Sequence, residues 1–171
     1  MAVTRIQIYN QIFNLTWTTV CLAPVVWLWY VHYHATILIV MFSVSLLTIL
    51  IPAGYLNLLQ VSKSRKFYES LAIKSLQSLT QNGGIVLKLA NKQNQNYRVI
   101  KSKAGFRSFA SRIAMYEKYH ISCLVFFLIS FIYAIYCGEL LISFLIFLSN
   151  IIYNIIPILI QQYNKLRLGF L

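Results

Sequence analysis

The sequence predicts an all-α integral membrane protein: four transmembrane helices in two hairpins, with two cytoplasmic-side amphipathic interfacial helices between the hairpins. Three observations predict this class. Hydrophobic residues make up 59% of the chain and charged residues only 11%, well away from the composition of soluble domains. Two long stretches, Ile6–Ser62 and Tyr119–Asn164, contain a single charged residue, Glu139. The segment Lys63–Lys118 between them carries most of the Lys and Arg residues.

The same composition excludes several other classes. A disordered chain needs low hydrophobicity, and a disulfide framework needs paired cysteines, whereas the three cysteines here lie in apolar runs. A net charge of +12 is also found in nucleic-acid-binding proteins, but those are far less apolar, so no nucleic acid partner is expected. The apolar N-terminal stretch is too long for a cleaved signal peptide. We therefore expect one membrane domain over residues 1–171.

The positions of the four spans follow from length and from the breaks. A hydrocarbon core about 30 Å thick needs roughly 20 helical residues, so each apolar stretch holds two spans. The first two are expected at 12–30 and 35–55, around a turn rich in aromatic residues and histidine, which suit a membrane interface. The second pair is expected at 120–136 and 140–161, around a tight turn at Cys137–Glu139.

The distribution of Lys and Arg sets the expected orientation. Cytoplasmic loops carry an excess of these residues, which places the basic segment 63–118 in the cytoplasm. Four spans then put both termini on the same side, in agreement with Arg5, Lys165 and Arg167 near the ends of the chain. The two opposite turns contain no Lys or Arg.

The basic segment is expected to contain both interfacial helices. Lys66–Thr80 has an apolar stripe at helical spacing opposite a polar, basic side, and Phe106–Lys118 repeats this pattern before it enters the third span. Residues 85–89 and 97–100 between them are compatible with a small hairpin. The basic side chains expected to contact the membrane surface are Lys66, Lys74, Arg107 and Arg112.

Glu117 and His120 are anomalous because both fall on the apolar face of the second amphipathic helix. Side chains three residues apart are neighbours on one helix face. His120 is therefore a candidate general base, with Glu117 orienting its ring. The alternative is a boundary ion pair of Glu117 with Lys118 or Arg112. A metal site is not expected, because further ligands at suitable spacing are missing.

A second polar feature runs down one face of the fourth span. Polar side chains inside spans usually face the bundle interior, and a proline there removes a backbone donor. The stripe suits either a polar head group and a developing oxyanion, or hydrogen bonds that hold helices together. It consists of Asn150, Asn154, Pro157, Gln161 and Asn164, and it ends at Lys165 and Arg167.

This C-terminal stretch resembles the glycosyl-4,4′-diaponeurosporenoate acyltransferases, small membrane enzymes that acylate a glycosylated carotenoid. Their pattern is N-x-P or N-x-x-P followed by Q-R-Y-N-R-x-R. Gln162 and Lys165 stand where the pattern has arginines. The family's E-x-x-H is similar to Glu117-x-x-His120, although Met115 and Ile121 replace its flanking Arg and Trp. The resemblance covers about residues 66–167, and its C-terminal matches are Asn154, Pro157, Gln161, Tyr163, Asn164 and Arg167.

The resemblance implies an acyltransferase of the bacterial cytoplasmic membrane. It would move a fatty acyl group from acyl-CoA or another activated donor, without a bound cofactor, to a hydroxyl of a glycosylated carotenoid or other glycolipid-like acceptor. His120 would take the hydroxyl proton and Glu117 would hold His120. Lys165 and Arg167 would meet a phosphate of the donor. The remaining substrate-binding residues would be Asn154, Gln161, Tyr163 and Asn164.

A non-enzymatic function stays open as the alternative. A small membrane subunit or scaffold would bind a larger partner through the polar stripe and the basic loop. A transporter has less support, because no inverted repeat is visible in the sequence. As partners we expect the lipid bilayer and an amphipathic glycosylated lipid or isoprenoid, and we leave open a homo-oligomer or a biosynthetic complex.

Overall fold

The computed structural model describes residues 5–80, 83–91 and 103–169, and every regular element in this part of the chain is helical. The longest helix, α6, has 34 residues and joins the second predicted amphipathic helix to the third predicted span without a break. The elements, in chain order, are α1 (Arg5–Val31), α2 (Ala35–Leu47), η1 (Thr48–Leu50), η2 (Ala53–Asn57), α3 (Arg65–Ser70), α4 (Ile73–Ser78), α5 (Gly84–Asn91), α6 (Lys103–Tyr136), α7 (Leu140–Asn150), η3 (Ile151–Ile155) and α8 (Ile156–Leu168).

Three helices in the described residues are long and apolar enough to cross a membrane. They cover Gln7–Val31, Ser111–Tyr136 and Leu140–Leu168, the last running through α7, η3 and α8. The second predicted span, expected at 35–55, is shorter than expected, because the apolar helix Ala35–Leu50 stops before Pro52. The residue before a proline is disfavoured in the helical conformation, and Ile51 accordingly has an extended ψ of 122°.

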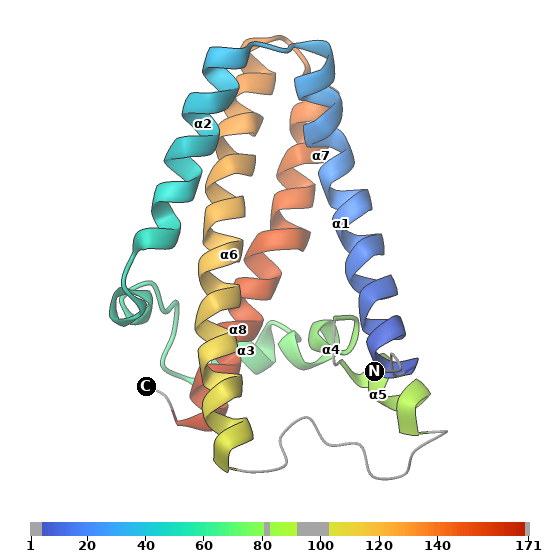
Figure 1. Cartoon of the computed structure of the whole chain (residues 1–171), viewed down its shortest axis with the longest axis vertical. Coiled ribbons are helices and arrows are strands. Elements are labelled where there is room, and N and C mark those ends of the chain that lie inside the picture. The colour runs from blue at the N-terminus through green and yellow to red at the C-terminus, as the bar shows by residue number, and fades with distance from the viewer. Residues whose placement is uncertain (1–4, 81–82, 92–102, 170–171) are drawn as a thin grey trace.

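The long helices converge at one end and separate toward the other, where α3, α4 and α5 lie across the open end (Figure 1). Both chain reversals lie at the converging end. His32 Nε2 and Glu139 Oε1 join the two turns at 2.9 Å. Gly138 has a φ of +81°, which favours glycine in the tight turn at 137–139.

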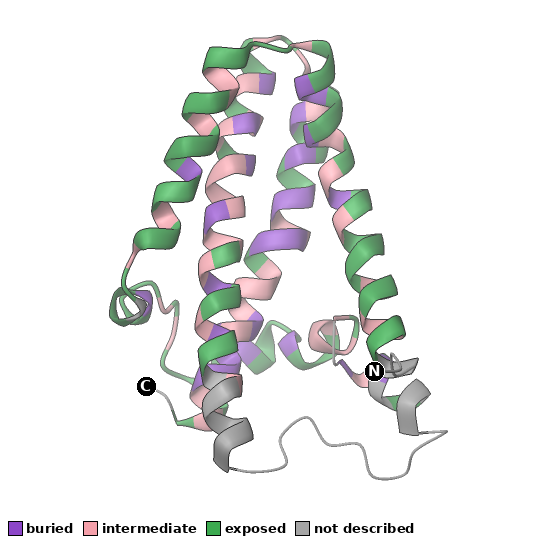
Figure 2. Cartoon of the chain, viewed as in Figure 1, coloured by how far each residue is buried: buried purple, intermediate pink, exposed green. Residues whose placement is uncertain are grey.

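One cluster of buried hydrophobic residues occupies the converging half of the bundle, and a second lies where α8 meets α3 and α4. Trp29 stacks on Tyr133 with ring centroids 4.9 Å apart, and its Nε1 donates to Ser130 Oγ at 3.1 Å. Figure 2 shows buried residues on the inner sides of the helices and exposed residues outside. These outward positions include many large apolar side chains, as expected where lipid covers the protein. The buried residues of the cluster in the converging half are Cys21, Val25, Leu28, Trp29, Phe127, Ala134, Ile146 and Tyr153.

The first predicted amphipathic helix is interrupted, so the prediction of one helix over Lys66–Thr80 is wrong. It consists of α3 and α4, separated by Ala72 in the left-handed conformation with φ +54°. The break allows both Tyr68 and Ile73 to be fully buried against α8, where they meet Tyr163. A straight helix would bury only one stripe, and these two residues are five positions apart.

The predicted hairpin is also wrong where it can be compared. Residues 85–89 lie in helix α5, which has a clear apolar side, and Val86 is fully buried. The partner segment 97–100 lies outside the described residues.

Candidate active site

The spanning helix Leu140–Leu168 changes its winding just before Pro157, and this change positions two polar residues. Proline has no N–H, so the carbonyl of Tyr153 loses its usual partner. The five residues of η3 form a π-helical turn, in which Ile156 N–H donates to the carbonyl of Ile151. Tyr153 and Asn154 are buried in this turn. Single π-turns inside α-helices frequently occur at functional sites.

Asparagine side chains connect this turn to α6. Asn154 Nδ2 donates to Asn150 Oδ1 at 2.8 Å, and Asn150 Nδ2 donates to the carbonyl of Leu124 at 3.3 Å. These bonds hold Asn154 in one orientation with its oxygen free. Asn154 Oδ1 is buried and accepts no hydrogen bond.

His120 lies on α6 beside this free oxygen. Its ring is next to the Asn154 side chain and stands edge-on to Tyr153, with centroids 5.8 Å apart. His120 Nδ1 is buried, and neither this atom nor Asn154 Oδ1 has a hydrogen bond of good geometry. Buried polar atoms without partners are rare, and these two lie close enough to pair with each other, which would leave His120 Nε2 as the ring nitrogen available to a substrate.

A chain of hydroxyl groups extends from this point across the bundle. Tyr119 OH lies 3.1 Å from Tyr153 OH, which lies 2.9 Å from Thr18 Oγ1. The three hydroxyls come from α6, η3 and α1. They therefore connect the His120 site to the first helix of the chain.

Glu117, one helical turn before His120 on α6, forms a buried ion pair with Lys165 on α8. Its Oε2 is 2.9 Å from Lys165 Nζ, and its Oε1 accepts from the same nitrogen at 3.1 Å. The carboxylate is fully buried, as its place on the apolar face predicts. Lys165 Nζ also donates to Asn57 Oδ1 at 3.5 Å. A buried charge needs such a partner, because isolated burial is costly.

The predicted contact between Glu117 and His120 is therefore wrong. The described residues show no hydrogen bond between them, because the cation that α8 brings to the carboxylate is a stronger partner than a histidine. The alternative of an ion pair was right in kind but named the wrong cation. Lys118 instead donates to the carbonyl of Ile49, and Arg112 lies over the ring of Phe109.

Gln162 is a residue that the sequence reasoning missed. It is almost fully buried and fastens the loop before α3 to α8. Its Nε2 donates to the carbonyl of Leu59 at 2.9 Å, while its Oε1 accepts from Val61 N–H and from the Tyr68 hydroxyl. The periodicity of the polar stripe selected Gln161, which is only partly buried. Gln162 stood out only as a departure from the family pattern.

The remaining residues of the motif form a separate cluster near α3 and α4. Tyr163 donates to Glu69 Oε1 at 3.1 Å, and Asn164 Oδ1 accepts from Gln77 at 3.2 Å. The Lys74 ammonium and the Tyr163 hydroxyl hold the pKa of Glu69 below its usual value. Arg167 is exposed, with its guanidinium 5.6 Å from the Tyr163 ring centroid. On α8, this cluster lies beyond Asn154, the residue of the same spanning helix that belongs to the His120 site.

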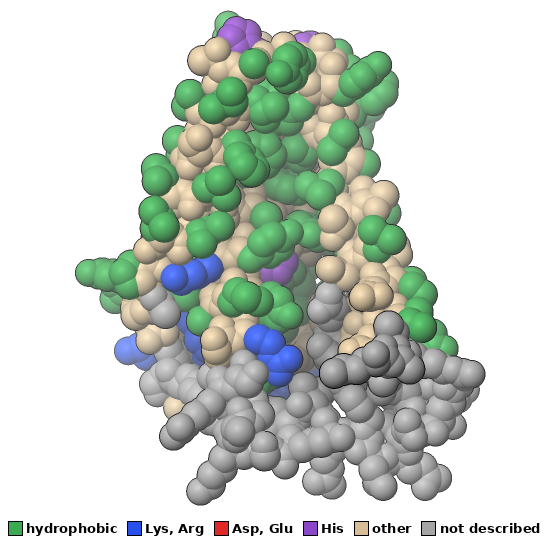
Figure 3. Space-filling model, viewed as in Figure 1, with side chains coloured by type: hydrophobic (Ala, Val, Ile, Leu, Met, Phe, Trp, Pro, Cys, Tyr) green, Lys and Arg blue, Asp and Glu red, His purple; other side chains and the backbone are tan. Residues whose placement is uncertain are grey.

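The basic residues expected at the membrane surface lie at the open end of the bundle. Lys66, Lys74 and Arg112 are exposed, whereas the side chain of Arg107 lies outside the described residues. Figure 3 shows Lys and Arg side chains only in the lower half of the face in view, with apolar side chains above them. In the described part of the chain, no three His, Cys, Asp or Glu side chains gather where they could hold a metal ion.

Together, the fold and the site define a small helical membrane protein with a polar site between its helices. A family model described as glycosyl-4,4′-diaponeurosporenoate acyltransferase matches residues 52–171, and the chain belongs to this family. It is an acyltransferase, as the resemblance in its motifs implied, and the family description assigns it to carotenoid biosynthesis. The match includes the His120 site and excludes α1. The comparisons with curated proteins and with solved structures returned no match.

Proposed function

We propose that the protein transfers a fatty acyl group from acyl-CoA, or another activated donor, to a hydroxyl of a glycosylated carotenoid or similar glycolipid. The observation that carries the proposal is the pairing of His120 with Asn154. Both lie between spanning helices, and each presents a buried polar atom without a well-oriented partner. The family match supports an enzyme, so the scaffold alternative is not favoured.

In this proposal His120 is the general base and Asn154 orients it. Asn154 Oδ1 accepts the Nδ1 proton and leaves Nε2 to take the proton of the acceptor hydroxyl, as in other His–Asn pairs. The acceptor oxygen attacks the acyl carbonyl, so a carbon–oxygen bond forms and the bond to the leaving thiol breaks. The proton held by His120 then goes to the leaving thiolate. Asn154 thus takes the positioning role that the sequence suggested for Glu117.

The motif cations have different roles in this proposal. Lys165 is held by Glu117 and fixes α6 against α8, so it is not available to a phosphate. Arg167 is exposed at the basic end and remains suited to a phosphate of the donor. Gln161, partly buried between these two levels, remains a candidate contact to the acceptor, whereas Tyr163 and Asn164 hold α3 and α4 beneath the site.

The proposal places four helices across the cytoplasmic membrane. The apolar helix Ala35–Leu50 would be the second span, with a length of about 24 Å at 1.5 Å per residue. The basic end, with α3 to α5 and both termini, would face the cytoplasm. Lys66, Lys74 and Arg112 would then meet anionic headgroups, and the donor would arrive from the same side.

The test compares His120→Ala with His34→Ala in isolated membranes. His34 is exposed in the turn at the other end of the bundle and makes no described side-chain hydrogen bond, so it is a matched control. Loss of a general base lowers rates by about 100-fold or more, which is the expected effect on acyl transfer for His120→Ala alone. Wild-type activity in a stably inserted His120→Ala protein would refute the assignment.

A further inference from the structure

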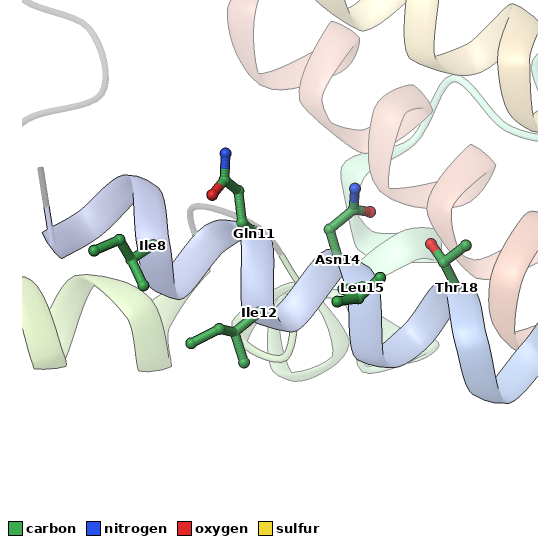
Figure 4. A pocket seen from close by; sticks show the side chains of 6 residues that line it. All are labelled: Ile8, Gln11, Ile12, Asn14, Leu15 and Thr18. Atoms are coloured by element: carbon green, nitrogen blue, oxygen red, sulfur yellow. The ribbon is translucent and has the colours of Figure 1, made fainter. Parts of the chain in front are cut away.

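A groove of about 500 Å³ follows the half of α1 that lies near the open end of the bundle. Six residues of this helix line it: Ile8, Gln11, Ile12, Asn14, Leu15 and Thr18. In Figure 4, Gln11 and Asn14 point from α1 toward the side where the fourth spanning helix lies, and Ile12 points the other way. The groove is therefore polar on the side that faces the bundle and apolar beside it.

The inner end of the groove reaches the His120 site. Thr18, which lines the groove, is 2.9 Å from Tyr153 OH, and the Tyr153 ring contacts that of His120. Thr18 and His120 also lie at similar depths in the bundle. Measured from the turns at the converging end and at 1.5 Å per residue, Thr18 and His120 both lie about 20 to 24 Å along their helices.

The polar lining consists of two carboxamides and a hydroxyl, and it includes no charged residue. In the described part of the chain, Gln11 and Asn14 have no hydrogen-bond partner and are exposed in the groove. A free carboxamide beside hydrocarbon is costly, and each one offers both donors and acceptors. Sugar hydroxyls match such groups. A phosphate would instead require Lys or Arg, which the groove lacks.

We propose that this groove binds the neutral sugar headgroup of the acyl acceptor and presents one of its hydroxyls to His120. The inference rests on the proposed function and adds its acceptor subsite. Ile8, Ile12 and Leu15 would contact the apolar part of the acceptor. In this proposal α1, which lies outside the residues matched by the family model, contributes to the choice of acceptor.

The kinetic test uses Asn14→Leu and Thr18→Val, with Thr19→Val as the matched control. Thr19 is exposed on the same helix and does not line the groove. Loss of a hydrogen bond to a bound hydroxyl is expected to raise the KM for the glycosylated acceptor about tenfold. The KM for acyl-CoA should stay unchanged, and Thr19→Val should match the wild type. An unchanged acceptor KM, or a rise in the acyl-CoA KM instead, would overturn the proposal.

A binding readout separates this inference from the proposed function. An alkyl glucoside with a diazirine in its chain is irradiated with the full-length protein in detergent micelles, and the labelled peptides are mapped. Labelling of residues 8–18 that Asn14→Leu abolishes and Thr19→Val preserves supports the groove even if no acyl transfer occurs. Labelling elsewhere, or equal labelling by an alkyl phosphate of the same length, overturns it. A protein that binds the glucoside but transfers no acyl group would refute only the proposed function.

Discussion

The carboxylate of Glu117 is fully buried between α6 and α8, and its partners determine its role. It contacts Lys165 through both oxygens, and the amide of Gln162 lies 3.5 Å away. Removing one member of a buried pair leaves an uncompensated charge, whereas removing both often costs little. The structure therefore makes Glu117 a residue that fixes two helices, and in the proposed function it is His120 that contacts the substrate.

The pair can be tested with a double-mutant cycle. Lys165→Met should lower the free energy of unfolding by about 3 kcal/mol, because the Glu117 carboxylate stays buried without its cation. Adding Glu117→Gln should recover most of that loss, which denaturant titration in detergent micelles measures. Lys74→Met is the control, since Lys74 pairs with Glu69 at the exposed surface and should change stability little. Additive losses in the double variant would contradict the paired role.

At the residue scale the sequence identified the unusual positions but not their partners. The placement of Glu117 and His120 on an apolar face predicted buried ionisable groups, and both lie between helices. Which cation meets Glu117 depends on how α8 packs against α6, and helical periodicity contains no such information. For the same reason Gln162 could not be found, since its contacts come from the loop before α3.

The spanning helix Leu140–Leu168 shows how one residue shapes an element. Pro157 removes a donor and the helix accommodates this with the π-turn of η3, which places Asn154 next to His120. A regular α-helix with the same sequence would rotate the residues before the turn relative to those after it. The winding of η3 is thus part of the site's geometry.

Pro157→Ala tests this relation, with Pro24→Ala in α1 as the control. Alanine restores the N–H and favours an ordinary α-helical turn, so Asn154 should move away from His120. Misplacement of about 1 Å costs roughly 100-fold in rate, and we expect an effect of that order on kcat without a loss of stability. Pro24→Ala should keep the wild-type rate. If Pro157→Ala does the same, η3 is irrelevant to the site.

At the element scale the long helices were predictable and the short ones were not. The spanning helices follow from the length and apolarity of their segments, and the turn at 137–139 follows from glycine. The break between α3 and α4 occurs at Ala72, a residue that normally favours helices, because packing of Tyr68 and Ile73 on α8 overrides its propensity. Pro52 ended the second span early, a signal that was present in the sequence.

The molecule as a whole is a bundle closed at one end and polar and basic at the other. The two turns at the closed end are joined by His32 and Glu139, and the described basic residues lie at the opposite end (Figure 3). In the proposed topology the closed end faces outward. The acceptor would enter from the membrane beside α1, while an anionic donor would approach the basic end from the cytoplasm.

Cysteine labelling tests this topology. The cysteines at 21 and 123 lie within the bundle, whereas Cys137 lies in a turn at the closed end. A membrane-impermeant maleimide should label Cys137 in intact cells, and Cys137→Ser should abolish the signal. Ser64→Cys in that background lies at the basic end and should react only after permeabilisation. Labelling of Ser64→Cys in intact cells would contradict the proposed orientation.

The whole-molecule arrangement was largely predictable, because charge asymmetry and hydropathy act over entire segments. The site was only partly predictable. The resemblance grouped all the motif residues into one site, but the structure separates His120 and Asn154 from Tyr163, Asn164 and Arg167. A helix of thirteen residues such as α8 spans about 20 Å, so one motif reaches two levels of the bundle.

The central claim is that His120 activates the acceptor hydroxyl, and the most direct measurement uses purified protein reconstituted in lipid vesicles. Wild type and His120→Ala are each supplied with radiolabelled acyl-CoA and a glycosylated carotenoid, and the acylated product is followed over time. The account predicts steady product formation by the wild type. For His120→Ala it predicts a rate lower by about 100-fold or more. Equal rates for the two proteins, or no product from the wild type, would contradict it.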